Sequence, residues 1–291
     1  MTSPKQTHSL AYLLLAFGIL CIGFSAIFVR IANVPGSVSA FYRVFLAAVI
    51  LVPWWVKRGM RIPTRSDLLL VMAGSIFFAL DLFLWNTSLL LTNAATATLL
   101  ANNAPVWVGL ISVLFLRQRL GKFFWLGLAL ALVGMSVLVG SEAWRMLTFN
   151  RGDVLALTAS FFYALYLLNT LQARKRLDTV TFMTFSVLFS MIVLLGINLT
   201  LGTSLVGFEP RTWLALLGLG VISHFGGWIS INYALGHLSA SNVSAMLLMQ
   251  SVVTALLAMP ILGEFLSLHQ VVGGIIVLAG IFVVNRRRAG S

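Results

Sequence analysis

The feature that most constrains this chain is a series of ten long apolar runs separated by short polar connections. The hydrocarbon core of a bilayer is about 30 Å thick, so a helix needs roughly 20 apolar residues to cross it. Strands would leave backbone groups unpaired in hydrocarbon, and barrel strands alternate instead of running apolar throughout. We therefore predict ten membrane-spanning helices, at residues 9–30, 37–56, 67–90, 94–116, 123–140, 152–172, 180–201, 212–235, 241–262 and 268–285.

The composition excludes a water-soluble globule. Hydrophobic residues fill 60% of the 291 positions and charged residues only 9%, against roughly 25% charged residues in soluble domains. The mean hydropathy is +1.01. We expect an all-α integral membrane protein whose principal surroundings are the lipid bilayer.

The net charge of +12 does not indicate a nucleic-acid partner, because the basic residues lie in short clusters between apolar runs. Such clusters are typical of the loops that set membrane topology. Cys21 is the single cysteine and lies in the first run, and no Cys/His spacing predicts a metal site. We expect no metal and no cofactor.

The distribution of Lys and Arg predicts the orientation. If the N-terminus is cytoplasmic, the inside segments carry 14 of the 19 basic residues and the outside segments carry four: Arg30, Arg145, Arg151 and Arg211. The remaining one, Arg43, lies within a span. Because cytoplasmic loops carry the excess of Lys and Arg, we predict a multi-pass protein of the cell inner membrane with both termini in the cytoplasm.

The sequence also contains an internal repeat. At a shift of 146 residues, the third to fifth spans align without a gap on the eighth to tenth, and Asn86 falls on Asn232. Gly127 falls on Gly273 and Gly134 on Gly280, which indicates close helix packing. The predicted units are residues 9–140 and 152–286. Each unit holds five spans, an odd number, so the second is inverted relative to the first, as in many secondary transporters.

Two segments occupy corresponding places in the two units: APVWVGLISVLFLRQRLGKFFWLGLALALVG (104–134) and QSVVTALLAMPILGEFLSLHQVVGGIIVLAG (250–280). They resemble the signatures of EamA-type transporters of the drug/metabolite transporter superfamily. In that family an early proline is followed by a Gly-Glu turn and a glycine-bearing helix. The proline is present as Pro105 but is replaced by Ser251, and the turn is present as Gly263-Glu264 but is replaced by Arg117-Gln118.

The resemblance implies two inverted five-helix repeats and export of amino acids or similar small metabolites by alternating access. The chain is also similar overall to an aromatic amino-acid exporter of that superfamily, which favours aromatic or other neutral amino acids as substrates. We expect a monomer that binds a small-molecule substrate, with protons as a candidate coupling ion.

Polar groups in mid-span are costly in lipid and usually face the bundle interior or a water-filled cavity. Phe77, Asp81 and Trp85 share one helix face, as do His224, Trp228 and Asn232 at the same spacing. Tryptophan and tyrosine rings suit a ring-bearing substrate, and methionine adds an adaptable wall. The predicted substrate-binding residues are Phe78, Asp81, Trp85, Asn86, Asn102, Asn103, Tyr163, Tyr166, His224, Trp228, Asn232, Met246 and Gln250.

Several of these residues carry two interpretations. Asp81 either binds a substrate ammonium or a proton, or forms a structural ion pair with Arg43. His224 is either a proton relay or a hydrogen-bonded packing residue. Asn86 and Asn232 either line the cavity or join helices by hydrogen bonds. Pro105 removes a backbone hydrogen bond, which predicts a kink that serves as a hinge.

The sequence lacks the motifs of an ATP-driven transporter, an intramembrane enzyme and an ion channel. No GxxxxGK[ST] loop is present, so we expect no ATP drive within this chain. The seven acidic residues form no cluster of the kind an intramembrane lipid-modifying enzyme requires, and no filter motif indicates a channel. We expect no enzymatic activity. A carrier for a drug or a sugar derivative remains an alternative, and a strictly anionic substrate is disfavoured because Arg43 is the only basic residue deep in a span.

Overall fold

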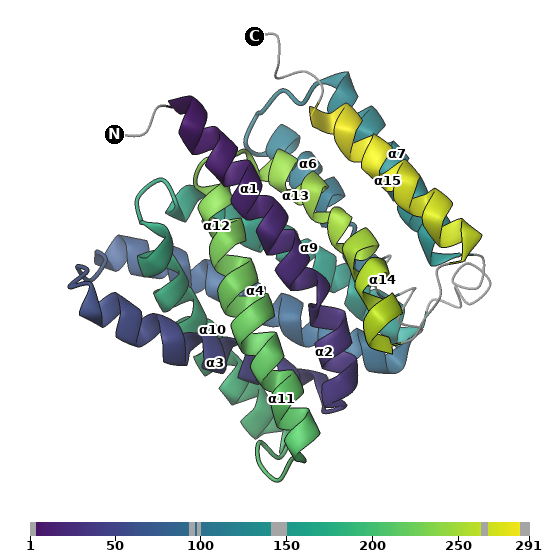
Figure 1. Ribbon diagram of the computed structural model, residues 1–291. Coiled ribbons are helices and arrows are strands. Elements are labelled where there is room, and N and C mark those ends of the chain that lie inside the picture. Colours follow the sequence, from purple (N-terminus) through teal and green to yellow (C-terminus); the bar gives the residue numbers. More distant parts are fainter. Residues whose placement is uncertain (1–3, 93–96, 98–99, 141–149, 263–266, 286–291) are drawn as a thin grey trace.

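A computed structural model describes residues 4–92, 97, 100–140, 150–262 and 267–285, and every regular element within these ranges is a helix (Figure 1). The all-α prediction is therefore confirmed for them. The Gly263-Glu264 turn lies outside the described residues. The elements are α1 (Pro4–Gly23), α2 (Ser25–Ala32), α3 (Gly36–Lys57), α4 (Arg65–Leu91), α6 (Ala104–Leu114), α7 (Lys122–Val139), α9 (Arg151–Ala173), α10 (Thr179–Leu201), α11 (Pro210–Gly218), η1 (Leu219–Trp228), α12 (Ile229–Leu235), α13 (Ala240–Leu247), α14 (Met249–Leu262) and α15 (Leu268–Asn285).

The described helices overlap the ten predicted segments; of the fourth, 94–116, α6 covers Ala104–Leu114, and residues 94–96 and 98–99 lie outside the described residues. Among the described residues, eight stretches are long and apolar enough to cross a membrane, and the apolar helices Ala104–Leu114 and Leu268–Val284 are shorter. Three spans are composite: α1 continues into α2, α13 is followed by α14, and α11, η1 and α12 together form the eighth span. The start of α1 and the end of α15 lie at the same end of the bundle (Figure 1), called here the termini end, and the opposite end is the far end.

Side chains fix the start of several helices by accepting backbone N–H bonds. Thr64 accepts one from Asp67 at the start of α4 (3.3 Å). At the start of α9, Asn150 and Asp153 accept each other's backbone N–H at 3.0 and 3.1 Å and form a capping box. Asp178 accepts two amides of the first turn of α10. These caps satisfy N–H groups that the helix itself leaves unpaired, so the helices begin at defined residues.

The packing of the helices follows an exchange of the two halves. The third span contacts the sixth (α4 with α9), and the eighth contacts the first (η1 and α12 with α1). The second packs on the seventh (α3 with α10) and the fifth on the tenth (α7 with α15). Each contact is matched by the one that results when every span is replaced by its counterpart, as expected for two inverted repeats.

The repeated asparagines join helices in equivalent ways. Asn86 Nδ2, on the third span, donates to Ser39 Oγ (2.9 Å) and to the Gly36 carbonyl oxygen (3.2 Å) on the second span. Asn232 Nδ2, on the eighth span, contacts Met183 Sδ (2.9 Å) on the seventh. Both side chains are fully buried. The helix-joining interpretation of this pair is therefore supported by matching contacts in both repeats.

The repeated glycines bring α7 and α15 into backbone contact at one edge of the bundle (Figure 1). A Cβ atom on Gly127 would lie 2.6 Å from the carbonyl oxygen of Gly280, and one on Gly280 would lie 2.6 Å from that of Gly127. Gly134 and Gly273 face each other in the same way. The predicted close packing is confirmed, and only glycine leaves room for it.

We expect Gly280→Ala to lower the stability of the protein by about 1–3 kcal/mol, because the atoms that the new methyl meets are backbone atoms of α7 that cannot rotate away. Thermal unfolding of the detergent-purified protein measures this. Gly196→Ala in α10 is the matched control, since nothing lies within 4 Å of its Cβ position. Equal unfolding temperatures for the two variants would contradict the packing argument.

Candidate functional site

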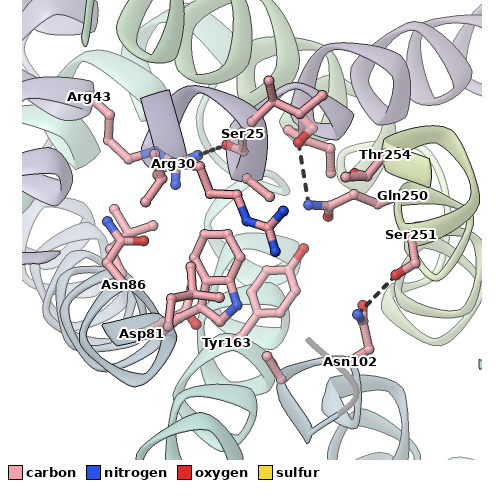
Figure 2. Close-up of a pocket in the computed structure, with 18 of the residues that line it drawn as sticks. Ser25, Arg30, Arg43, Asp81, Asn86, Asn102, Tyr163, Gln250, Ser251 and Thr254 are labelled. Carbon is pink, nitrogen blue, oxygen red and sulfur yellow. Dashed lines mark hydrogen bonds between the residues drawn. The ribbon is translucent and has the colours of Figure 1, made fainter. Parts of the chain in front are cut away.

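A cavity of about 410 Å³ lies between the two halves of the chain (Figure 2). Its walls come from α1, α2, α3, α4 and α7 of the first half and from α9, η1, α14 and α15 of the second. Small-molecule sites have volumes of roughly 300–1,000 Å³ and are mostly apolar with a few placed polar groups. The position between inverted repeats is where secondary transporters hold their substrates.

The cavity reaches the surface at the far end. Its exposed lining residues, Arg30, Asn33 and Leu90, lie at the far ends of α2 and α4. Tyr163 and Trp228 lie deeper in their spans. Within the described chain, none of the lining residues belongs to the connections at the termini end.

The structure brings about half of the predicted site residues to this cavity. The lining includes Asp81, Trp85, Asn86, Asn102, Tyr163, Trp228 and Gln250. The predicted residues outside the lining are Phe78, Asn103, Tyr166, His224, Asn232 and Met246, together with Pro105. The spacing of polar residues therefore located the right spans but not which side chains face the opening.

An aromatic cluster, formed by Phe78, Tyr166 and Trp228, closes the cavity toward the termini end. Phe78 stacks on Tyr166 with ring centroids 4.3 Å apart, and Trp228 meets them edge-on at 4.7 and 5.4 Å. All three side chains are buried, and only Trp228 lines the cavity. The cluster joins the third, sixth and eighth spans, so it separates the cavity from the termini end.

Hydrogen bonds continue this closure beyond the aromatic cluster. Asn232 Nδ2 and the Tyr166 hydroxyl are 3.1 Å apart, and Arg174 Nε donates to the carbonyl oxygen of Asn232 (3.0 Å). At the surface of the same end, Arg176 Nη1 lies 3.5 Å from Asp67 Oδ1. The Arg176 side chain is 62% exposed, so this ion pair contributes at most about 1 kcal/mol. The buried contacts dominate the closure.

Three charged side chains line the cavity: Arg30, Arg43 and Asp81. Arg43 is only 3% exposed, and its Nη2 donates to Ser25 Oγ at 3.1 Å. One interpretation of Asp81 is a direct ion pair with Arg43. In the described structure this pair is not formed, because no nitrogen of Arg43 lies within 4.0 Å of a carboxylate oxygen of Asp81. The two groups still interact electrostatically across the cavity.

The charge count predicts Arg30 in an outside connection. The structure places it in the last turn of α2, where it lines the cavity (Figure 2). The only sequence signal was its alignment with Arg176 in the repeat. Arg43 remains the basic residue deep in a span, and Arg30 adds a second guanidinium to the cavity lining near its opening.

His224 lies in the π-helix η1 and is fully buried beside Phe78, with ring centroids 5.6 Å apart. Neither ring nitrogen has a hydrogen-bond partner among the described residues. The interpretation of His224 as hydrogen-bonded packing therefore does not hold for this state. Single π turns inside α-helices occur frequently at functional sites.

The remaining predicted residues surround the break at the start of α6. Asn102 Nδ2 donates to Ser251 Oγ of α14 (3.1 Å), whereas Asn103 Nδ2 bonds the nearby carbonyl of Leu100 (3.1 Å). Pro105 lies in the first turn of α6, where its missing N–H costs no helical bond. The polypeptide thus breaks before Pro105 instead of kinking around it. Met246 packs against both hydrophobic clusters of the protein.

The cavity combines two guanidinium groups, one carboxylate, amide and hydroxyl side chains, and aromatic rings. Among the described residues, no group of three or more His, Cys, Asp or Glu is placed to hold a metal ion. Such a set of groups is suited to binding a polar small molecule with an apolar part.

Comparison with known proteins agrees with this architecture. An uncharacterized transporter of Archaeoglobus fulgidus is 27% identical over 97% of this chain and 99% of its own length. A probable terminal-alkyne amino-acid exporter of Streptantibioticus cattleyicolor is 25% identical over 85% of this chain and 83% of its own. A solved crystal structure superimposes with a TM-score of 0.81 at 19% identity, covering 97% of this chain and 99% of that one, which shows a shared fold.

The family assignment comes from a match in both halves of the chain. The sequence model of the EamA-like transporter family matches residues 9–140 and again residues 150–286. Two matches of one model within one chain are what an internal repeat produces. The protein belongs to the EamA-like transporter family.

Proposed function

We propose that the protein is a secondary transporter that exports amino acids, aromatic or other neutral ones above all, across the inner membrane by alternating access. The observation that carries the proposal is the cavity between the inverted halves, which is open at the far end and closed at the termini end by the aromatic cluster. The amino-acid exporter among the relatives supports the substrate class.

The symmetry of the contacts supports alternating access. The main inter-span contacts of the two halves correspond, yet the described cavity opens at the far end. If the halves exchanged their conformations, the far end would close and the termini end would open around the same central residues. Pro105 is proposed as a hinge in this exchange, because the break before it separates α6 from the preceding residues.

The excess of basic residues in the connections at the termini end supports a cytoplasmic location for both tails. In that orientation the cavity described here faces outward and represents the state after substrate release. We propose that the protein acts as a monomer, with residues 9–140 and 152–286 as its two units. Asp81 and His224 are the candidate groups for proton coupling.

A carrier of sugar derivatives or drugs is the second candidate function. Two arginines against one carboxylate in the cavity favour a ligand that carries at least one negative group. Neutral sugars and lipophilic cations fit this charge balance less well than amino acids. An intramembrane enzyme is disfavoured because the cavity lining contains Asp81 as its one acidic side chain, whereas acid–base catalysis needs further paired groups.

We expect purified protein in liposomes to move phenylalanine, tryptophan or threonine down a concentration gradient, because the cavity provides both charged and aromatic groups. Uptake of radiolabelled amino acid measures the flux. An imposed pH gradient that changes the rate would assign proton coupling, and empty liposomes provide the background. Absence of flux for every amino acid tested would remove the proposed substrate class.

Alternating access predicts that a covalent link across the closed end blocks transport. In a Cys21→Ser background, Asp67→Cys combined with Arg176→Cys places two thiols where the side chains now meet. We expect a short bifunctional thiol reagent to abolish the flux and a reducible version to restore it on reduction.

The matched control is Thr64→Cys with Ser66→Cys, whose hydroxyl oxygens are 3.0 Å apart within the start of α4 alone. This pair takes up the same reagent without joining the two halves. Full transport activity after verified cross-linking of the Asp67–Arg176 pair would argue against opening at this end.

A further inference from the structure

Arg43 and Asp81 line one cavity with opposite charges but without touching. Arg43 is on α3 and Asp81 is on α4. In the described structure no guanidinium nitrogen of Arg43 lies within 4.0 Å of a carboxylate oxygen of Asp81. A buried charge is costly unless it is paired and hydrogen-bonded. Two such groups left apart in the same cavity indicate that a third, bridging group completes them.

Neither charge is satisfied by the rest of the described structure. The Arg43 side chain is buried, with 3% of its surface exposed. It makes one hydrogen bond among the described residues, to Ser25 Oγ. Its Nε is buried without a hydrogen-bond partner among the described residues. Asp81 is half-buried, and none of the described side chains or amides donates a hydrogen bond to it. The cavity therefore offers hydrogen-bond donors of Arg43 on α3 and acceptors of Asp81 on α4 that a ligand can pair with.

The surroundings define what lies beyond these charges. Trp85 lies one helical turn from Asp81 on α4, and Tyr163 and Trp228 form the deep wall. Arg30 is an exposed residue in the last turn of α2 that also lines the cavity, and Figure 2 draws it among the other lining side chains. A ligand whose charged end lies between α3 and α4 would direct its remaining atoms toward the aromatic side chains.

We propose that the cavity recognises a zwitterion, with Arg43 holding the α-carboxylate and Asp81 the α-ammonium of one amino acid, while Arg30 attracts the carboxylate at the entrance. This inference rests on the proposed function and adds the groups that define its substrate. Guanidinium–carboxylate and ammonium–carboxylate hydrogen bonds are charge-assisted and stronger than neutral ones. An α-amino acid supplies both charges on a single carbon, so it completes both protein groups at once.

The proposal predicts strong discrimination against analogues that lack either group. Phenethylamine lacks the carboxylate and leaves Arg43 unpaired, whereas 3-phenylpropanoate lacks the ammonium and leaves Asp81 unpaired. We expect each to compete with labelled phenylalanine on the order of 100-fold more weakly than phenylalanine itself, because sites built around a polar group reject ligands without it. Competition for phenylalanine binding or uptake in liposomes measures this.

Two isosteric variants assign the groups. Asp81→Asn should weaken phenylalanine and phenethylamine but leave 3-phenylpropanoate nearly unchanged. Arg43→Gln should weaken phenylalanine and 3-phenylpropanoate but leave phenethylamine nearly unchanged. Binding of each unlabelled compound is measured by the rise that it causes in the unfolding temperature. The unfolding transition also shows whether each variant folds.

Arg61→Gln, at an exposed position of the α3–α4 connection, controls for the loss of one positive charge. Arg43→Lys keeps the charge but not the planar fork and should restore part of the phenylalanine response. If transport occurs but all three compounds compete equally, or both variants weaken all three equally, the zwitterion inference is wrong while the proposed function stands. If no amino acid binds or moves, both are wrong.

Discussion

The structure depends on one constraint: hydrocarbon cannot hydrate a charge or an unpaired backbone group. Helical segments satisfy the backbone of the described chain, and the charged residues deep in the spans, Arg43 and Asp81, line one cavity together with Arg30 near its opening. The same constraint places the glycine pairs of α7 and α15 in backbone contact, because apolar side chains gain little from packing on each other in lipid. Charge is thus confined to the path that a substrate would take.

The symmetry of the fold makes the difference between its two ends informative. The third and sixth spans pack together as the eighth and first do, so the two halves are equivalent in their contacts. At the termini end, Phe78, Tyr166 and Trp228 fill the space between spans. At the far end, the equivalent space is the cavity. The two repeats thus form two ends of different structure, as the proposed alternating access requires.

The sequence was sufficient for the helices, the repeat and the family, because these depend on runs and spacings longer than one turn. It was insufficient for the facing of single side chains. Trp228 lines the cavity while His224 and Asn232 do not, although all three were placed on one face. The π-helix accounts for the different facing of His224 and Trp228, since its i to i+5 hydrogen bonds change the number of residues per turn. Asn232 lies in α12, one turn beyond Trp228 toward the termini end. Arg30 was missed because charge counting treats the end of a span as a connection.

The repeated asparagines show how the open end of the protein differs chemically from the closed end. At the closed end, Asn232 bonds the sixth and seventh spans through Tyr166 and Met183. At the open end, Asn86 bonds only the second span, and its Oδ1 is buried with no partner among the described residues. The Trp228 Nε1 and Arg43 Nε atoms, also on cavity-lining residues, are in the same condition. Each buried unpaired group costs roughly 1–3 kcal/mol, so a ligand that pairs with Trp228 Nε1 or Arg43 Nε would remove part of that cost.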